Sequence, residues 1–275
     1  MNNFKTFGLM AILTLLLIFL GGLIGGQAGA MIALVVAGIG NFVSYYFSDK
    51  LILKAYRAEE LPLDHKVTRI VRQLAERARL PMPKVYMIPQ NQPNAFATGR
   101  NPQNAVVAVT SGLVNHMNDQ ELSGVLAHEL GHIANRDILI GTVAATLAGA
   151  ISYLGYASHF GLGGRNNRNS NPIFLLLAII LAPLAASLIR MAISRTREYK
   201  ADAYGATVSG NPAFLSSALS RLETMSNQIP MRGNDATSHM FIIHPFKGGF
   251  SQLFSTHPST AERIRRLNEM TGSRY

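Results

Sequence analysis

Apolar and charged positions divide the chain into long uncharged tracts and shorter charged blocks. No charged residue lies between Lys5 and Asp49, a stretch about twice as long as the ~20 apolar residues that one helix needs to cross a bilayer. Residues 7–23 and 31–47 are therefore predicted to be two membrane spans, joined by a glycine-rich turn. This tract predicts a helical hairpin in a membrane.

A second uncharged pair covers residues 138–164 and 169–189, and each member is long enough to cross a bilayer. Buried helices of a soluble core are the alternative for both pairs, but the lengths favour a membrane. A cleaved secretory signal is a further alternative for the first tract, because Ala28, Gly29 and Ala30 imitate a cleavage site. Its apolar run is longer than usual, so we predict four transmembrane helices.

Charge sets the orientation of these spans and limits the possible partners. Lys5 precedes the first span, Lys50 and Lys54 follow the second, and the turn between them is uncharged, which places both flanks in the cytoplasm. The chain has 25 Lys+Arg against 15 Asp+Glu, a net charge of +10. Because 48% of the residues are hydrophobic and only 15% are charged, we assign this excess to an anionic membrane surface and expect no nucleic acid partner.

The apolar tracts separate the chain into an N-terminal transmembrane hairpin (1–48), a second transmembrane pair (138–193) and two soluble pieces (49–137 and 194–275). In the first soluble piece, residues 63–79 carry apolar side chains at helical spacing. Residues 84–88, 94–98 and 105–110 have strand-like composition between Pro and Gly signals, which predicts a small sheet with one exposed edge.

The clearest chemical motif follows this predicted sheet. A capping box that starts at Asn118 predicts a helix that carries His128, Glu129 and His132. Residues four apart share a helix face, so the two imidazoles can bind one zinc ion, beside which Glu129 can take a proton from an activated water and pass it to the leaving amine. This is the H-E-x-x-H pattern of metalloproteases. Chance spacing is the alternative, but the capped, apolar helix favours catalysis.

A catalytic zinc needs a third protein ligand. The chain lacks cysteine, so this ligand must be His, Asp or Glu. Asn135 and Ile138 stand where the longer H-E-x-x-H-x-x-G-x-x-H motif requires Gly and His, which excludes that motif. Glu198 and Asp202 lie one helical turn apart, so one can bind the metal while the other accepts the outer N–H of a ligand histidine. Alternatively, both acids are solvated partners of nearby Arg and Lys.

Together these motifs resemble the HtpX membrane heat-shock endopeptidases, a branch of the membrane zinc-protease family that includes the CAAX prenyl proteases. The resemblance covers the whole chain. The features that match are the two pairs of apolar tracts, residues 94–99, His128-Glu129-x-x-His132, Glu198-x-x-x-Asp202, and His257-Pro258 followed by Arg263.

The resemblance implies a role for each residue of the metal motif. His128, His132 and Glu198 are implied to bind one Zn²⁺ per chain, with Glu129 as the catalytic base. Asp202 is implied to accept a hydrogen bond from the outer ring nitrogen of a ligand histidine. A mainly α integral membrane protein of α+β type follows, in which four transmembrane helices carry a zincin-like cytosolic catalytic domain with a small β-sheet.

The resemblance also implies that His257 and Arg263 stabilise the negatively charged oxygen of the transition state. Arg263 has an alternative, because it can pair with Glu262 or Glu269 on a solvated face.

The predicted sheet edge suggests where a substrate binds. If Asn94, Ala95, Phe96 and Ala97 form the open edge, they are expected to bind an extended peptide as an added strand.

The function expected from these features is endoproteolysis. The resemblance implies cleavage of misfolded or damaged membrane proteins at the bacterial inner membrane, as part of protein quality control and the stress response, with the active site facing the cytoplasm. The alternatives are a CAAX-type protease that processes prenylated proteins and a non-catalytic membrane scaffold with a structural metal. The second alternative gives no reason for Glu129 to stand beside the metal.

Overall fold

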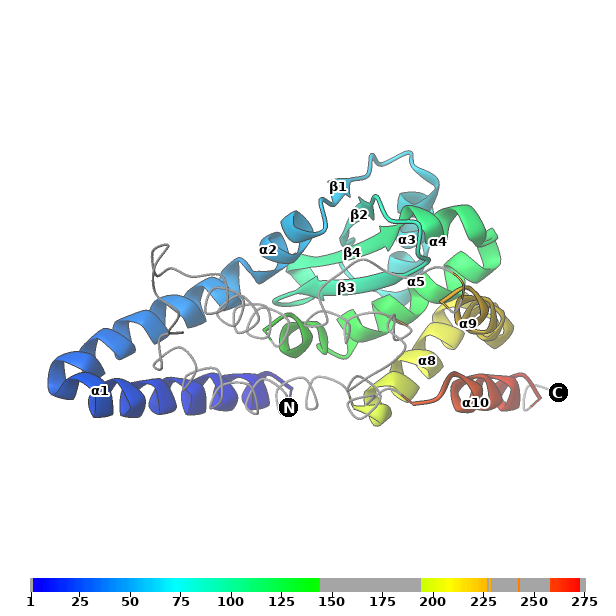
Figure 1. Cartoon of the computed structure of the whole chain (residues 1–275). Coiled ribbons are helices and arrows are strands. Elements are labelled where there is room, and N and C mark those ends of the chain that lie inside the picture. The colour runs from blue at the N-terminus through cyan, green and yellow to red at the C-terminus, as the bar shows by residue number, and fades with distance from the viewer. Residues whose placement is uncertain (1, 144–193, 227, 229–241, 243–257, 273–275) are drawn as a thin grey trace.

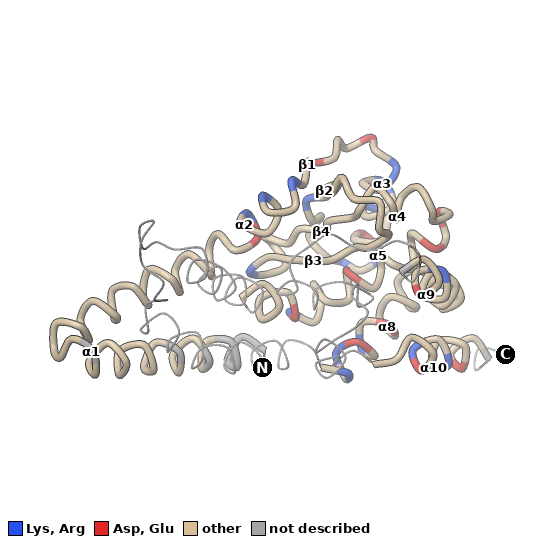
Figure 2. The backbone as a smooth tube through the Cα atoms, in the orientation of Figure 1, with Lys and Arg blue, Asp and Glu red and all other residues tan. Residues whose placement is uncertain are grey.

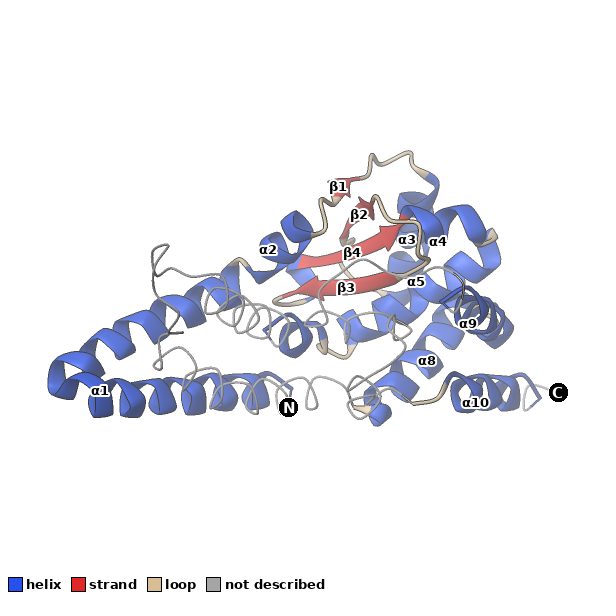
Figure 3. Cartoon of the chain, in the orientation of Figure 1, coloured by secondary structure: helices blue, strands red, loops and turns tan. Residues whose placement is uncertain are grey.

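The computed structural model describes residues 2–143, 194–226, 228, 242 and 258–272. A small β-sheet forms its centre, helices cover both faces of the sheet, and a long N-terminal helical hairpin projects from it (Figure 1). The strands form one block and most other described residues are helical (Figure 3). The prediction of a mainly α protein with a small sheet is confirmed.

The N-terminal tract forms helix α1 (Asn2–Tyr46), which turns back on itself at Gly25 and Gly26 (Figure 1). Gly26 has a φ of 59°, a left-handed conformation that glycine adopts without a steric penalty. The two arms are joined by a hydrogen bond of 2.8 Å that the Asn41 amide donates to the Thr14 hydroxyl. The predicted hairpin is therefore present, and its turn lies at the glycines.

The structure does not confirm all four predicted spans. Among the described residues, Gly25–Tyr46 is the one helix long and apolar enough to cross a membrane, and the apolar part of the first arm, Met10–Leu23, is shorter. Of the second predicted pair, only residues 138–143 are described, and these are helical. Residues 144–193 lie outside the described residues, so one membrane-length helix is observed where four were predicted.

The sheet has the strand order β1-β2-β4-β3. Strands β2 (Lys84–Ile88) and β4 (Ala105–Thr110) are parallel, and β3 (Ala95–Gly99) runs antiparallel to β4 at one edge. All three predicted strands are present. Strand β3 begins one residue late, at Ala95, because the N–H of Asn94 donates to the side-chain hydroxyl of Thr110 on β4. The short strand β1 (Glu59–Glu60) was not predicted, since two exposed acids carry no strand pattern.

Each face of the sheet is covered by its own helices. Helix α2 (Ser48–Ala55) covers one face, where Ile52 and Leu53 pack with Phe96. Helices α3 (Lys66–Ala78) and α5 (Asp119–Ala134) cover the other face. Helix α3 is shorter than the predicted 63–79, because the His65 side chain caps its first turn and Arg79 ends it in a left-handed conformation.

Three further helices pack beyond α5, namely α8 (Arg195–Ser209), α9 (Pro212–Ser226) and α10 (Thr260–Gly272). Two shorter elements, η1 (Pro102–Asn104) and α4 (Ser111–His116), flank β4. Glycines let α5 and α8 approach closely. A Cβ on Gly131 would lie 3.0 Å from the Cα atom of Ala201, and a Cβ on Gly205 would lie 2.8 Å from the backbone nitrogen of His128. This crossing brings distant parts of the sequence together.

Candidate metal centre

Two histidines of α5 and one glutamate of α8 converge where these helices cross. The Nε2 atom of His132 lies 3.5 Å from Oε1 of Glu198, and Nε2 of His128 lies 3.7 Å from Oε2. One donor atom from each residue lies within 4.8 Å of the other two. Zinc bonds of ~2.0–2.2 Å in a tetrahedron separate neighbouring ligand atoms by about 3.3–3.6 Å. Small side-chain movements therefore suffice for these three groups to hold one ion.

The local sequence explains why the histidines face one point. Helix α5 begins with the predicted capping box, in which Asn118 and Glu121 each accept the other's backbone N–H. The rings of His128 and His132, four residues apart, lie 4.8 Å from each other and nearly perpendicular. Fixed helical geometry thus places both Nε2 atoms beside Glu198.

A carboxylate also stands at the outer nitrogen of each histidine. Nδ1 of His128 lies 2.8 Å from Oδ1 of Asp202, and Nδ1 of His132 lies 3.4 Å from Oδ2 of Asp137. A carboxylate in this position orients the ring and favours the tautomer in which Nε2 has a free lone pair. Asp202 had been predicted for this position, whereas Asp137 had not.

Glu129 lies beside this group and is almost fully buried, with 2% of its surface exposed. The backbone N–H of Ala97 donates a hydrogen bond to its carboxylate. Burial raises the pKa of Glu129, although His128 and His132 oppose the shift. A carboxylate with a raised pKa can accept a proton and then donate it, as a general base must do in peptide hydrolysis.

The charges around His132 favour its protonated form when no metal is bound. Burial by itself lowers the pKa of an imidazole, but Glu198, Asp137 and Glu129 together outweigh burial and raise the pKa of His132 to about 9. A metal ion must displace this proton in order to bind Nε2.

Arg263 extends from α10 into the same site, with 2% of its surface exposed. Its guanidinium binds Asp202 through two hydrogen bonds of 2.8 and 2.7 Å and donates a third, of 2.9 Å, to the Ile242 carbonyl. Burial would raise the pKa of Asp202, but Arg263 and His128 hold it at about 2. Nη1 of Arg263 also lies 3.7 Å from Oε2 of Glu198. The arginine therefore fixes the carboxylate that orients His128.

The solvated alternative for Arg263 is wrong. Glu262 pairs with Arg265 and Arg266, and Glu269 pairs with Arg265. The role of Arg263 in stabilising a transition-state oxygen stays a prediction. His257, its expected partner in that role, lies outside the described residues.

The segment predicted to bind substrate lies next to these groups. Asn94 accepts hydrogen bonds from the N–H groups of Ala95 and Ile242, and Ala97 faces Glu129. The side chain of Phe96 is buried on the opposite face of the sheet, against α2. Strand β3 thus runs along the site with its outer edge toward α5.

The balance of buried charge fits a divalent cation. Among the described residues, four carboxylates are buried around the site, and the guanidinium groups of Arg263 and Arg197 are the cations near it. Burial lowers the pKa of Arg197, whereas Asp137 and Glu198 oppose the shift. With neutral histidines, an excess of negative charge remains, which one Zn²⁺ neutralises. The carboxylates are Glu129, Asp137, Glu198 and Asp202.

Comparison with known proteins agrees with this chemistry. Peptidase family M48 matches residues 62–271, a range that contains every side chain of the site. The chain belongs to peptidase family M48. As a member of this family it is a metallopeptidase, and its His-His-Glu group is compatible with the metal that such enzymes use.

Relatives of this M48 peptidase carry the name expected from the sequence motifs. The chain is 51% identical to "Protease HtpX homolog" of Syntrophotalea carbinolica, over 98% of the chain and 99% of that protein. It is 51% identical to "Protease HtpX" of Legionella pneumophila subsp. pneumophila, again over 98% of the chain and 99% of that protein. The resemblance to the HtpX branch is confirmed.

A solved structure shares the fold. The crystal structure of S. mikatae Ste24p superposes with a TM-score of 0.52 and is 23% identical, covering 94% of this chain. This M48 peptidase spans 62% of that longer chain. At this identity the likeness shows the fold alone.

Sequence reasoning missed two contributors to the site. Asp137 lies five residues after His132, one position beyond helical spacing, and only the turn between them brings its carboxylate back to the ring. Ile242 contributes backbone atoms, which bind Asn94 and Arg263 and carry no signal in the sequence.

Proposed function

We propose that this M48 peptidase is a membrane-embedded zinc metalloendopeptidase that cleaves misfolded or damaged membrane proteins at the bacterial inner membrane. The observation that carries the proposal is the convergence of His128, His132 and Glu198 beside the buried carboxylate of Glu129. Two histidines and one glutamate leave a fourth position open for water or substrate, which is the composition of catalytic zinc sites.

The residues of the site divide the reaction between them. When bound, zinc supplies a Lewis acid that lowers the pKa of a water molecule and polarises the substrate carbonyl. Glu129 takes the proton of the attacking water on its carboxylate and returns it to the leaving amine. The raised pKa of Glu129 suits it to hold this proton between the two steps. His257 and Arg263 stabilise the negative charge that develops on the carbonyl oxygen.

The substrate lies along the outer edge of β3 as an added strand. Ala95 and Ala97 are on the edge strand, and Ala97 directly adjoins Glu129. Their N–H groups are already bonded to Asn94 and Glu129, so an incoming peptide pairs first with carbonyl oxygens of the edge and takes over these N–H groups as it settles. Recognition through the backbone predicts broad sequence specificity, which suits a protease that removes damaged proteins.

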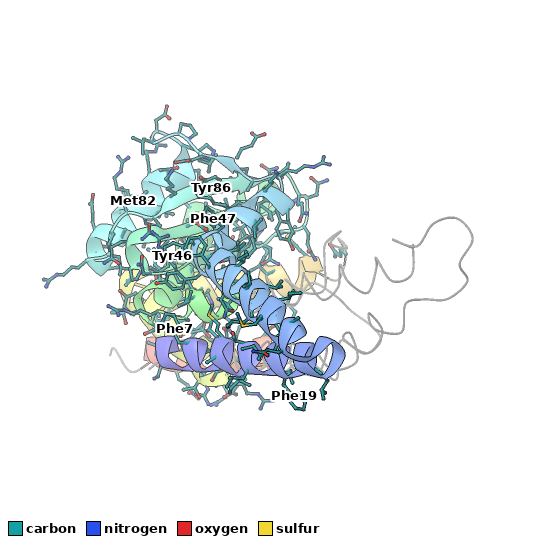
Figure 4. The ribbon with its side chains drawn as sticks, turned by 90° about the vertical axis from the view of Figure 1, so that its left-hand side faces the viewer. Phe7, Phe19, Tyr46, Phe47, Met82 and Tyr86 are labelled. Atoms are coloured by element: carbon teal, nitrogen blue, oxygen red, sulfur yellow. The ribbon has the colours of Figure 1, made fainter. Side chains whose placement is uncertain are left out.

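The exposed apolar side chains of the N-terminal hairpin, and the aromatic and basic side chains at its base, support insertion in a bilayer. Beyond Lys5, helix α1 carries no charged residue, and the other charged residues of the described part of the chain lie outside this helix (Figure 2). Phe19 lies toward the tip of the hairpin, and Tyr46 and Phe47 lie at its base (Figure 4). Several α1 side chains have more than half of their surface exposed, including Ile12, Leu15, Phe19, Leu23, Ile32, Val35 and Ile39.

The base of the hairpin combines aromatic rings with cations. Lys50 Nζ lies 5.4 Å from the ring centre of Phe47, and the Arg100 guanidinium lies 5.0 Å from that of Tyr46. Aromatic rings and basic side chains at one end of a span favour the cytoplasmic interface of a membrane. This supports a multi-pass protein whose active site faces the cytoplasm.

Zinc-dependent cleavage of an unfolded protein by the purified full chain tests this function. Wild-type protein should cleave the substrate, lose activity with a chelator and regain it with Zn²⁺. Glu129→Gln should keep its zinc and lose turnover, because Glu129 acts on the water and is not a ligand. Near-normal turnover of this variant would refute the assigned role, and no cleavage by the wild type would favour the scaffold alternative.

The substrate class needs a separate experiment. Membrane proteins that co-purify with the inactive Glu129→Gln variant under stress should be misfolded or misassembled species. Selective enrichment of prenylated proteins would instead support the CAAX-type alternative.

A further inference from the structure

The segment that follows α5 contacts the site at both of its ends. Its first residue, Asp137, has Oδ2 3.4 Å from Nδ1 of His132. Five residues later, the hydroxyl of Thr142 lies 2.9 Å from that of Thr98 on the edge strand. Residues 137–143 thus touch a metal-site histidine with one side chain and strand β3 with another, and both side chains are buried.

The turn at the end of α5 aims the Asp137 carboxylate at the His132 ring. Arg136 adopts a left-handed conformation with a φ of 56°, and the Asp137 N–H donates to the His132 carbonyl at 2.9 Å. This bond closes a Schellman turn, so Asp137 meets His132 with both its backbone and its side chain. A left-handed conformation is unfavourable for a non-glycine residue, so the surrounding contacts must offset its cost.

The carboxylate of Asp137 contacts the ring of His132 in the same way that the carboxylate of Asp202 contacts the ring of His128. Each carboxylate is buried, with 7% and 4% of the residue exposed, and each lies at the Nδ1 atom of a ring whose Nε2 atom faces Glu198. Asp202 comes from a different helix, whereas Asp137 is supplied by the turn that ends the histidines' own helix. A carboxylate therefore holds the Nδ1 atom of each of the two histidine rings.

We propose that Asp137 is a positioning residue of the zinc site. Its carboxylate accepts the Nδ1–H of His132, which fixes the tautomer that offers the Nε2 lone pair to the metal and holds the ring toward Glu198. The inference rests on the proposed function, because it assigns a purpose to the ring orientation only if His132 binds zinc.

A competing role for Asp137 is purely structural. The residue precedes the helical residues 138–143, and its carbonyl accepts the N–H of Gly141 at 3.5 Å, so its side chain also stands at a helix start. Asn and Asp cap helices about equally well. An Asn amide, however, has no negative charge and can turn its NH₂ group to the ring, which stabilises the wrong tautomer. Asp137→Asn therefore separates positioning from capping.

The test measures the zinc dissociation constant of the full chain in detergent, by competition with a chromophoric chelator. Asp137→Asn should weaken zinc binding by about 10–100-fold, as loss of the hydrogen-bond partner of a metal-binding histidine typically does. Above pH 9, where His132 is neutral in both proteins, the melting temperature of the metal-free variant should stay close to that of the wild type. With cobalt(II) in place of zinc, the visible absorption spectrum should change, because the ligand geometry changes.

Thr142→Val is the matched control in the same segment. It removes a buried hydrogen bond to β3 without touching His132, so it should lower the melting temperature and leave the zinc dissociation constant within about twofold of the wild type. An unchanged zinc affinity in Asp137→Asn would overturn the proposal, as would an equal loss of affinity in Thr142→Val. A wild-type chain that binds no zinc would overturn the proposed function and this inference with it.

Discussion

The backbone N–H of Ala97 donates a hydrogen bond to the carboxylate of Glu129. This bond joins the edge strand of the sheet to the residue expected to act as the base. Helix α5 and strand β3 pack side by side, so the bond places the base at the edge where a peptide would add. If a peptide adds at this edge as proposed, one peptide group links substrate binding to proton transfer.

Replacement of Ala97 by proline tests this link. The variant loses the N–H that holds Glu129 and that the peptide then takes over, so we expect a large fall in kcat/KM with a smaller loss of stability, because proline is tolerated on edge strands. Ala95→Pro is the matched variant, since it removes an edge N–H that bonds to Asn94 instead. Kinetics and thermal melting of both variants provide the measurement. Equal losses of stability and activity in both would indicate a merely structural strand.

Removal of a ligand should release the metal. Glu198→Ala leaves two histidines, fewer than the three protein ligands of an open zinc site, so zinc content should fall well below one ion per chain. His132→Ala should behave in the same way. Elemental analysis of the purified proteins measures this. Full zinc occupancy in either variant would show that the altered residue is not a ligand.

His257 is expected to act on the transition state alone. His257→Phe should keep zinc and substrate affinity, while kcat falls by about 10²-fold, the usual loss when one donor to the oxyanion is removed. Steady-state kinetics with an unfolded protein substrate separate kcat from KM. A rise in KM alone would place His257 in substrate binding, and loss of zinc would place it among the ligands.

Zinc uptake should release a proton from His132. The pKa of this residue is raised to about 9 without metal, so at pH 8 most molecules carry the proton that Nε2 must lose to bind zinc. Calorimetric titration with Zn²⁺ in buffers of different ionisation enthalpy should show this release at pH 8 and its disappearance above the pKa. The same heat in every buffer at pH 8 would contradict the prediction.

The raised pKa of His132 also affects the metal-free fold. The pKa in the folded state exceeds the ordinary value of 6.5, so protonation stabilises the metal-free protein fully below pH 6.5. This contribution is lost as the pH rises through about 9. The melting temperature of the chelated protein should therefore fall over that range, and zinc should reduce the dependence.

Short-range patterns in the sequence determined much of the protein. The uncharged N-terminal tract predicted a hairpin because it holds two long apolar runs separated by glycines, and the capping box predicted where α5 begins. His128 and His132 were predicted to face one point because a helix fixes the geometry of residues four apart. Each of these features depends on neighbours within a few turns, which is why the sequence alone was sufficient.

Tertiary structure alone decided how the site is completed. Glu198 lies far from the histidines in sequence, and only the close crossing of α5 and α8 brings it to them. Arg263 had a solvated alternative, which the packing of α10 removed by burying its side chain against Asp202. Asp137 reaches His132 through a left-handed turn at Arg136, and arginine is not a residue type that predicts a left-handed conformation. These contacts depend on the free energy of packing between distant segments. The conformational propensities of individual residues do not include that free energy.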